Sequence, residues 1–487
     1  MTKGFTVAKQ VGVLVPLFSL PGEYGIGDID SLYKFVDKMA NLNVQIIQLL
    51  PMNAVSEGET SPYSSISSFA INPLYISLDR LPFVAKNIEK AIIIDKVDYK
   101  AAYRIKFQVF NESWQGFLSK ASQLQKNQFK KFKKDFKKWL EPYTIFHCLM
   151  SQNKKAFWDW DESVQNLIGG QEWYKENSLS VDFFAYLQWI TFTQWKDLKS
   201  YAQEKKVKLM GDLPLYVSKN SSDYWSRPKL FKKGVHAGVP PDMYSEDGQD
   251  WGNPIYDWEV MKKDKFLWWK ERITWMKEFF DLVRIDHVRG LYSYWEVPDG
   301  SLPKDVKDWT PGPGAALFES LKETGMELIG EDLGDIPKEV EEWMKKIKLP
   351  GYKVFLFGWG EYKADNYRFI ENYPKNTLAC TSTHDSESYW EFLEALTDEQ
   401  VYELGTYLGI KSDERFTLED IRKRSIKKLL NSKSDYVIIP LQDILAKGIR
   451  INLPGSISDE NWSKLITIED SDKEKLNEFS QWITEIN

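Results

Sequence analysis

Eight short apolar runs, rich in valine, isoleucine and leucine, recur along the chain and constrain its fold more than any other feature. They are apolar throughout rather than alternating, which is typical of strands buried on both faces, as in a parallel sheet. Helical stretches separate the runs, for example at residues 30–42, 337–348 and 418–431. This alternation indicates repeated βα units. The runs lie at residues 11–17, 44–51, 207–217, 280–287, 326–334, 352–357, 377–385 and 436–445.

Eight βα units are the number that closes a (β/α)8 TIM barrel, so we predict this α/β fold. A bare barrel needs about 250 residues, whereas the chain has 487, so we expect one catalytic barrel, residues 1–487, with large helical and loop insertions. Residues 84–195 lack a strand pattern and are interpreted as a helical subdomain inserted after the second strand. Residues 214–258 are rich in Pro, Gly, Asp, Tyr and Trp. We interpret them as a loop-rich insertion that covers the active site.

Composition excludes several classes of protein. The formal net charge of −7 gives the chain no overall attraction for nucleic acid. No apolar stretch reaches the roughly 20 residues that span a bilayer. The two cysteines, Cys148 and Cys380, have the spacing of neither a disulfide framework nor a zinc site. We therefore expect a cytoplasmic protein with no nucleic-acid or membrane partner, and its oligomeric state stays open.

Acidic residues follow several of the apolar runs. In barrel enzymes the catalytic groups lie at the carboxyl ends of the strands, so we expect these acids to meet at one mouth. Each acid could instead cap the helix that follows it. Acids at four strand ends, together with nearby Arg and His side chains, make capping the poorer explanation. The acids are Asp212, Asp286, the adjacent pair Glu331 and Asp332, and Asp385, and the other polar residues are Arg284, His287 and His384.

The local spacing sharpens this interpretation. Arg284 and Asp286 are two positions apart, so a strand places them on one face, where the guanidinium would orient the carboxylate. Glu331 and Asp332 are adjacent and point to opposite faces, and parity alone does not decide which one faces the mouth.

Two or three acids, no thiol nucleophile and many aromatic residues suit glycoside cleavage, in which one acid protonates the leaving oxygen and a second attacks or activates water. A site in which the four carboxylates bind Mg²⁺ stays an alternative.

Longer motifs carry a resemblance to a known family. Arg284–Gly290 followed by Tyr294–Glu296, then Gly330–Gly334, then Thr383–Asp385 resemble the 4-α-glucanotransferases of the amylomaltase or disproportionating-enzyme family, glycoside hydrolase family 77. The matches run in order from residue 11 to about residue 462. Further matching stretches lie at residues 19–28, 61–76, 211–225, 237–258, 312–318, 439–445 and 452–455.

The resemblance implies a retaining double displacement on α-1,4-glucans, with maltooligosaccharides and glucose as substrates and no cofactor or metal. It implies that Asp286 is the nucleophile, that Glu331 rather than Asp332 is the general acid/base, and that Asp385 is a third acid that grips substrate hydroxyls. It also implies substrate-binding roles for Arg284, His287, His384, Asp212, Ser61, Tyr63, Trp251, Asn253 and Tyr244.

The chain departs from the family pattern at Ser386, where Asn is usual, and at Met243, where Tyr is usual. Two other functions remain open at this point. An α-glucan hydrolase on the same barrel would yield only shorter sugars, and a catalytically inactive glucan-binding protein would yield no product.

Overall fold

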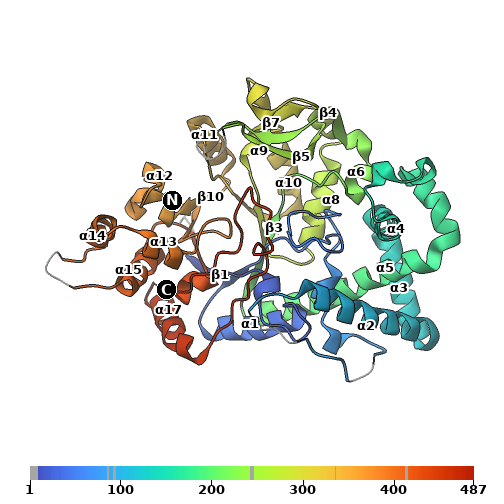
Figure 1. Ribbon diagram of the computed structural model, residues 1–487, viewed down its shortest axis with the longest axis horizontal. Helices are drawn as coiled ribbons and strands as arrows, with labels where there is room; N and C mark the ends of the chain where they lie inside the picture. Colours follow the sequence, from blue (N-terminus) through green and yellow to red (C-terminus); the bar gives the residue numbers. More distant parts are fainter. Residues whose placement is uncertain are drawn as a thin grey trace, which may run out of the picture.

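The computed structural model describes residues 9–84, 87–91, 95–241, 246–334, 336–411 and 415–486. Its centre is a sheet of eight parallel strands, and each predicted apolar run contributes one of them (Figure 1). In sheet order the strands are β10 (Gly351–Val354), β11 (Thr377–Cys380), β12 (Tyr436–Pro440), β1 (Gln10–Leu14), β2 (Ile46–Gln48), β3 (Lys208–Leu213), β6 (Leu282–Ile285) and β9 (Glu327–Gly330).

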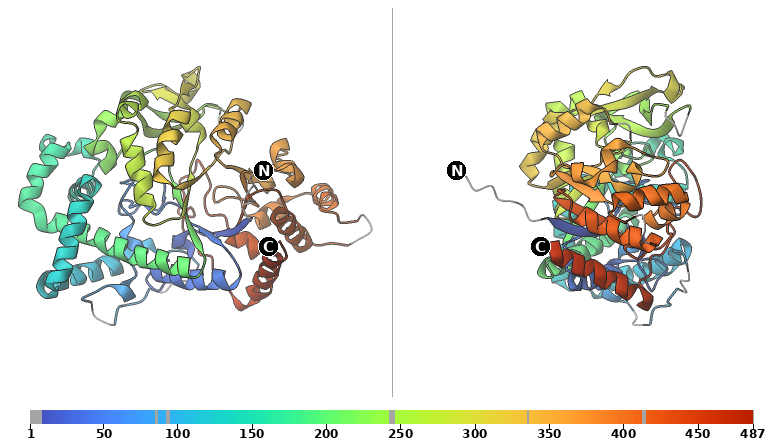
Figure 2. Two further views of the ribbon diagram at one scale, coloured as in Figure 1. Left: turned by 180° about the vertical axis from the view of Figure 1, so that it is seen from behind. Right: turned by 90° about the vertical axis from the view of Figure 1, so that its left-hand side faces the viewer.

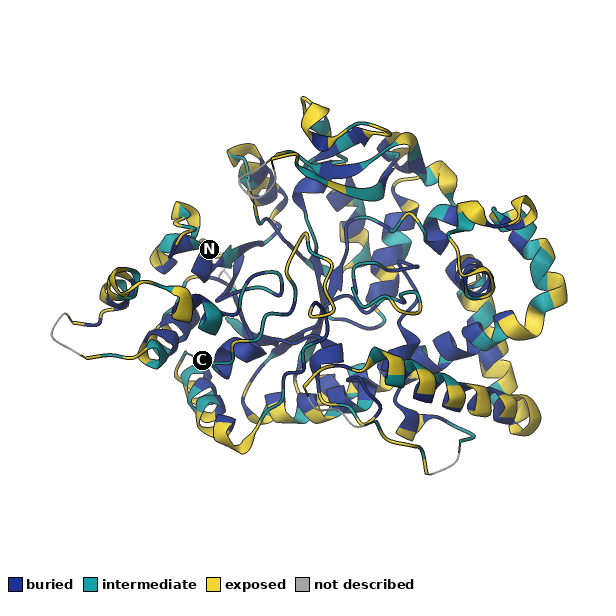
Figure 3. Ribbon diagram, in the orientation of Figure 1, coloured by how far each residue is buried: buried dark blue, intermediate teal, exposed yellow. Residues whose placement is uncertain are grey.

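The two outer strands of this order, β9 and β10, approach each other and nearly close the sheet. The backbone N–H of Gly330 donates to the carbonyl oxygen of Pro350, which precedes β10, at 2.8 Å. Every residue of β6, β11 and β12 is buried, which explains why their sequences are apolar on both faces. Figure 3 shows the buried strands at the centre and the exposed surface on the surrounding helices. The predicted (β/α)8 barrel is confirmed.

Amphipathic helices cover the outside of the barrel. Helix α1 (Ile29–Asn41) begins at Asp28, whose side chain accepts the N–H groups of Asp30 and Ser31. Helices α11 (Lys338–Ile347) and α15 (Leu418–Leu430) likewise bury one apolar face. These helices match the three predicted helical stretches. The other α-helices that follow β5 (Gln249–Tyr256) in the chain are α7 (Trp258–Lys263), α8 (Leu267–Met276), α9 (Arg289–Tyr292), α10 (Ala315–Leu321), α12 (Asp365–Arg368), α13 (Tyr389–Ala395), α14 (Asp398–Tyr407), α16 (Leu441–Ile444) and α17 (Lys473–Ile486).

The chain between β2 and β3 is largely helical. Figure 2 shows these helices, cyan to green, on the opposite side of the molecule from α13 to α17. The last of them has non-helical backbone geometry at Asn177 and continues past residue 195 to Glu204, shortly before β3 begins at Lys208. No helix within the described ranges is long and apolar enough to cross a membrane. The helices are α2 (Tyr99–Lys120), α3 (Gln123–Asp135), α4 (Lys137–Asn153) and α5 (Leu167–Glu204).

A second, antiparallel sheet lies beside the barrel. Its strand order is β5 (Gln249–Tyr256), β4 (Phe231–Val239), β7 (Ser293–Pro298) and β8 (Thr310–Pro311). The segment 214–258, interpreted above as loop-rich, therefore contains two strands as well as the short helix α6 (Ser222–Ser226). Strand β4 pairs with both β5 and β7, so this sheet joins the segment after β3 to the segment after β6.

Candidate active site

The predicted polar residues lie at the carboxyl ends of barrel strands. Asp212 on β3 and Arg284 on β6 are register partners on neighbouring strands. Asp286 is the first residue after the end of β6. Glu331 follows β9, the next strand of the sheet. Because parallel strands end at one rim, these side chains meet although up to 119 positions separate them in the sequence.

Arg284 is the hub of this cluster, and its side chain is only 6% exposed. Its Nη1 lies 2.8 Å from both carboxylate oxygens of Asp212 and 2.9 Å from Oδ1 of Asp286. Its Nη2 lies 3.7 Å from Oε2 of Glu331. Although burial lowers the pKa of the guanidinium, the surrounding carboxylates, Asp212 first, raise it well above its ordinary value. One buried cation therefore contacts three of the four predicted acids.

Glu331 is largely buried and is held by backbone groups. Its Oε2 accepts the N–H of His287, and its Oε1 accepts the N–H of Leu333, both at 2.7 Å. Burial raises its pKa to about 7, nearby Asp286 adds to this, and Arg284 and the two N–H groups oppose it. A carboxyl group with this pKa can both give and take a proton near neutral pH.

The backbone of His287 supports this arrangement. His287 has a φ of +45°, a left-handed conformation that is uncommon outside glycine. This turn directs its N–H to Glu331, and the following residue, Val288, donates its N–H to the backbone carbonyl of Glu331 at 2.9 Å. Sequence reasoning selected His287 for its ring and missed its backbone role, because a φ value is not readable from residue type.

The structure separates the two adjacent acids that strand parity left open. Glu331 faces Arg284, whereas Oδ1 of Asp332 accepts the N–H of Tyr352 on β10 at 2.5 Å. Burial raises the pKa of Asp332 to about 6. Asp332 therefore helps to join β9 to β10 and does not reach the Arg284 cluster.

Asp385 lies on the loop after β11, and its side chain is 44% exposed. Its Oδ2 lies 3.2 Å from Nε2 of His384, and its Oδ1 accepts Nδ2 of Asn452 at 2.7 Å. Burial would raise its pKa, but His384 and Asn452 outweigh this effect and hold the pKa at about 2. Asp385 is therefore ionised throughout the physiological pH range.

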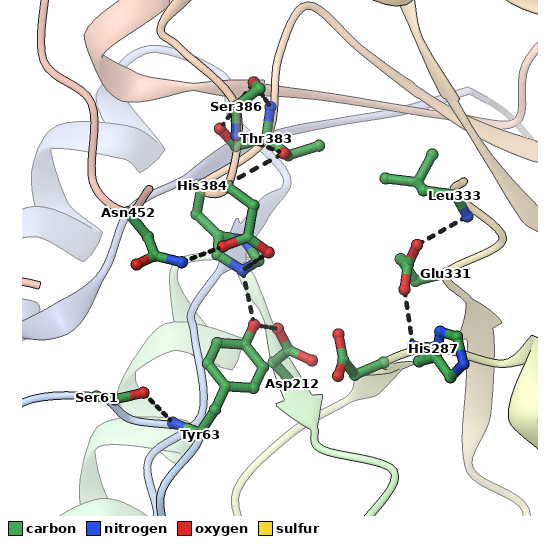
Figure 4. A network of polar contacts seen from close by, with 12 residues as sticks. Ser61, Tyr63, Asp212, His287, Glu331, Leu333, Thr383, His384, Ser386 and Asn452 are labelled. Atoms are coloured by element: carbon green, nitrogen blue, oxygen red, sulfur yellow. Dashed lines mark hydrogen bonds and ion pairs between the residues drawn. The ribbon is translucent and has the colours of Figure 1, made fainter. Parts of the chain in front are cut away.

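Tyr63 connects the Asp385 side of the site to the Arg284 side. Its hydroxyl donates to Oδ2 of Asp212 at 2.8 Å and lies 2.9 Å from Nε2 of His384 (Figure 4). The ring of Tyr63 stacks on His384, with centroids 5.5 Å apart. Burial would lower the pKa of His384, but Asp385 raises it above its ordinary value. The four acids thus belong to one polar network.

The remaining predicted residues surround this network. Oγ of Ser61 accepts the N–H of Tyr63 at 3.3 Å, and so shapes the turn that presents the tyrosine. The ring of Trp251 on β5 meets the ring of His287 edge-on, with centroids 5.0 Å apart. Asn253 donates its Nδ2 to the carbonyl oxygen of Val217 at 2.9 Å, which ties β5 to the loop after β3. Tyr244 and Met243 lie outside the described residues.

The chain matches one protein family over most of its length. The family described as 4-α-glucanotransferase, glycoside hydrolase family 77, matches residues 15–469. The chain belongs to this family. It is 35% identical to the 4-α-glucanotransferase of Clostridium butyricum, over 91% of this chain and 94% of the relative, and 32% identical to that of Synechocystis, over 93% and 92%.

A solved member of the 4-α-glucanotransferase family has the same fold. The amylomaltase of Streptococcus agalactiae, in complex with acarbose, is 30% identical and superimposes with a TM-score of 0.89 over 98% of this chain and 99% of that one. The family membership inferred from the sequence motifs is therefore confirmed.

Within this family member, two polar residues at the site were not selected from the sequence. Asn452 lies in the matching stretch 452–455, but nothing in its sequence context identifies its contact with Asp385, 67 positions away. Gln48 on β2 donates to the hydroxyl of Tyr352 at 3.2 Å, beneath Arg284. Both are single amides in apolar or turn sequences, so residue type alone offered no signal.

The alternative of a Mg²⁺ site formed by the four carboxylates is not supported by the arrangement of the described residues. In this part of the chain no group of three or more His, Cys, Asp or Glu side chains is arranged to hold a metal ion. The partners of the acids include Arg284, His384, the Tyr63 hydroxyl, the Asn452 amide and backbone N–H groups.

Proposed function

We propose that this member of the family transfers a segment of an α-1,4-glucan to the 4-hydroxyl of glucose or of another α-glucan by a retaining double displacement. Family membership carries the activity. The observation that carries the mechanism is the Arg284 guanidinium, which contacts Asp286 at 2.9 Å and Glu331 at 3.7 Å. A retaining enzyme needs two carboxyl groups about 5 Å apart, and sharing one guanidinium supports that spacing.

In the first step, the Asp286 carboxylate attacks the anomeric carbon of the donor glucose unit. Glu331 gives its proton to the glycosidic oxygen, so that the bond breaks and the reducing-side fragment leaves. The product is a glycosyl ester on Asp286. The pKa of Glu331, raised to about 7 by burial, supports its role as the acid in this step.

In the second step, the ionised Glu331 removes the proton from the 4-hydroxyl of the acceptor. The acceptor oxygen attacks the anomeric carbon, the ester bond to Asp286 breaks, and both carboxyl groups return to their starting states. Two inversions retain the α configuration. Transfer prevails over hydrolysis when the acceptor sugar occupies the site and water is excluded.

The remaining residues hold the donor glucose unit. Asp385, with a pKa of about 2, is an ionised acceptor for sugar hydroxyls, and His384 is a neighbouring donor. Asp212, Tyr63 and Arg284 fix these groups from below. We also assign His287 to the donor glucose unit, and Ser61, Trp251, Asn253 and Tyr244 to further contacts with the substrate. In this proposal the segment 214–258 covers the active site, and residues 84–195 form an inserted helical subdomain.

Product analysis from maltotriose tests the proposal. We expect glucose together with maltooligosaccharides longer than maltotriose. A mixture of shorter sugars alone would indicate an α-glucan hydrolase, and the absence of any product would indicate a binding protein. Because the Streptococcus agalactiae relative is in complex with acarbose, we also expect acarbose to inhibit this reaction competitively.

We also propose a cytoplasmic location. Both cysteines, Cys148 and Cys380, are buried free thiols, which suits a reducing compartment. Cell fractionation with an antibody against the chain tests this.

A further inference from the structure

The loop at residues 381–388 carries His384 and Asp385 from β11 to α13. Asp385 is the most exposed of the three acids assigned to the reaction, at 44%, compared with 26% for Asp286 and 10% for Glu331. A loop-borne acid has no strand backbone to fix its direction. Its position therefore depends on what holds the loop.

Both ends of this loop are bound by the buried carboxylate of Asp443. Asp443 lies in α16, directly after β12, and β12 is the neighbour of β11 in the sheet. Its Oδ2 accepts the hydroxyls of Thr381 and Ser382, each at 2.5 Å. Its Oδ1 accepts the N–H of Tyr389 at 2.8 Å. Thr381 and Ser382 begin the loop, and Tyr389 is the first residue of the helix that ends it.

Asp443 is fully buried, so it cannot touch a sugar. Burial raises its pKa to about 6, and its three hydrogen bonds and Arg422 oppose that rise. Arg422, 1% exposed, donates to the backbone carbonyls of Asp443 and Ile444 at 3.3 and 2.8 Å, and Glu419 holds its other side. Removing one partner of a buried, hydrogen-bonded carboxylate costs free energy, because the remaining groups stay buried and unsatisfied. The hydrogen bonds of Asp443 therefore fix the positions of the groups that donate to it.

We propose that Asp443 is a positioning residue for the transfer reaction: it clamps both ends of the loop 381–388 and so fixes His384 and Asp385 against the donor glucose unit. This inference rests on the role proposed above for Asp385. Because hydrogen bonds to sugar hydroxyls strengthen in the transition state of glycoside cleavage, a displaced loop lowers kcat more than it raises KM.

Asp443→Asn is the first test because it keeps the size of the side chain. The carboxylate offers only acceptors to its three donors, whereas the carboxamide presents an NH2 group to Tyr389 or to the two hydroxyls. We expect kcat for maltotriose disproportionation to fall about 30-fold, because a displacement of about 1 Å can cost about 100-fold. We expect KM to change by about twofold at most.

Asp472→Asn is the matched control. Asp472 is also almost fully buried and lies just before α17. Its Oδ2 accepts the N–H of Glu469 at 2.9 Å and lies 3.0 Å from Nζ of Lys447, both partners lying outside the loop 381–388. We expect this variant to keep kcat within about twofold. An equal loss of kcat in both variants would mean that any buried carboxylate matters, and would overturn the proposal.

The deciding measurement combines Asp443→Asn with Asp385→Asn. If Asp443 acts through Asp385, its substitution costs only about twofold in kcat when Asp385 is already replaced, measured from product chromatography over long incubations. A general effect on folding would cost the same factor in both backgrounds and would overturn the proposal. So would an unchanged kcat for Asp443→Asn alone, provided that Asp385→Asn loses activity.

If Asp385→Asn itself leaves the rate unchanged, the third-acid assignment fails, and this inference fails with it. Ser382→Ala is the second variant, for the case in which Asp443→Asn does not fold. It removes one of the three donors to Asp443. We expect kcat to fall about fivefold, which corresponds to the net free energy of about one hydrogen bond. That loss must also disappear in the Asp385→Asn background, and its persistence there would contradict the inference.

Discussion

We call Asp286 and Glu331, which directly follow strands, the strand-borne side of the site, and Asp385, which lies on a loop, its loop-borne side. The two sides are built differently. Asp286 and Glu331 follow the neighbouring strands β6 and β9, and one buried guanidinium contacts both. Asp385 stands on a loop, and a neighbouring histidine and an amide from residue 452 hold its carboxylate. Asp286 and Glu331 lie close together because they follow neighbouring strands. Asp385 is instead held by contacts with His384 and with Asn452, which lies 67 positions further along the chain. Substitutions on the two sides should therefore differ in size and in kind.

The largest effect is expected on the strand-borne side. Asp286→Asn removes the proposed nucleophile, and we expect kcat to fall by about 10⁴-fold or more, because no ester can form. Thermal unfolding should be nearly unchanged. The control is Asp281→Asn, which alters a carboxylate at the opposite end of the same strand, where it accepts the N–H of Leu209. A near-normal rate for Asp286→Asn would disprove the assignment of the nucleophile.

The adjacent pair Glu331 and Asp332 provides the next test. Glu331→Gln should lower kcat by about 10²- to 10⁴-fold, since it removes the proton donor. Asp332→Asn should change kcat by no more than about twofold, because its carbonyl oxygen can still accept the N–H of Tyr352. Initial rates with maltotriose measure both variants. A larger loss for Asp332→Asn would reverse the assignment of the general acid.

The pH dependence follows from the pKa of Glu331, which burial raises to about 7. The acid form is needed for the first step, and a raised pKa keeps the proton bound up to that pH. Below pH 7 kcat/KM should level off with respect to this group, and above pH 7 it should fall about tenfold per pH unit as the proton is lost. A profile that stays flat to pH 9 would contradict this prediction. The Glu331→Gln variant should lose this decline at high pH.

The smallest effect is expected on the loop-borne side. Asn452→Ala removes the 2.7 Å hydrogen bond to Asp385, and the loss of one hydrogen bond to a charged group corresponds to about a tenfold fall in kcat/KM. Because Asn452 helps to hold the pKa of Asp385 near 2, the variant should also lose activity at a higher pH when acidified. Asn431→Ala, which changes an exposed amide bonded to the backbone of α15, is the control. An unchanged kcat/KM would show that Asn452 does not hold Asp385.

The barrel was predictable because its strands are mostly buried on both faces and therefore read as continuous apolar runs. The site was largely predictable for a related reason: the residue that ends a parallel strand lies at the mouth of the barrel. This rule alone selected Asp212, Asp286, Asp385 and the adjacent pair Glu331 and Asp332 as a group. It could not choose between Glu331 and Asp332, since adjacent residues differ only in the face to which they point.

The antiparallel sheet was not predictable from the same signal. Strand β4 contains two lysines, two glycines and a histidine, and β5 contains Gly252 and Pro254. Neither strand has an apolar pattern, because both are partly exposed. Strand β5 pairs with β4, and β4 also pairs with β7, which begins more than 50 positions after β4 ends. Pairing over such separations is decided by the whole fold and not by local composition.

Residue order alone determined the alternation of apolar strands and amphipathic helices, the closure that eight such units allow, and the gathering of carboxylates at one rim, because these follow from local periodicity. The tertiary structure decided which acid becomes buried and keeps its proton, and which amide, hydroxyl and carboxylate groups hold the loop of Asp385. Desolvation and hydrogen bonding depend on groups that are distant in the sequence and meet only when the chain is folded.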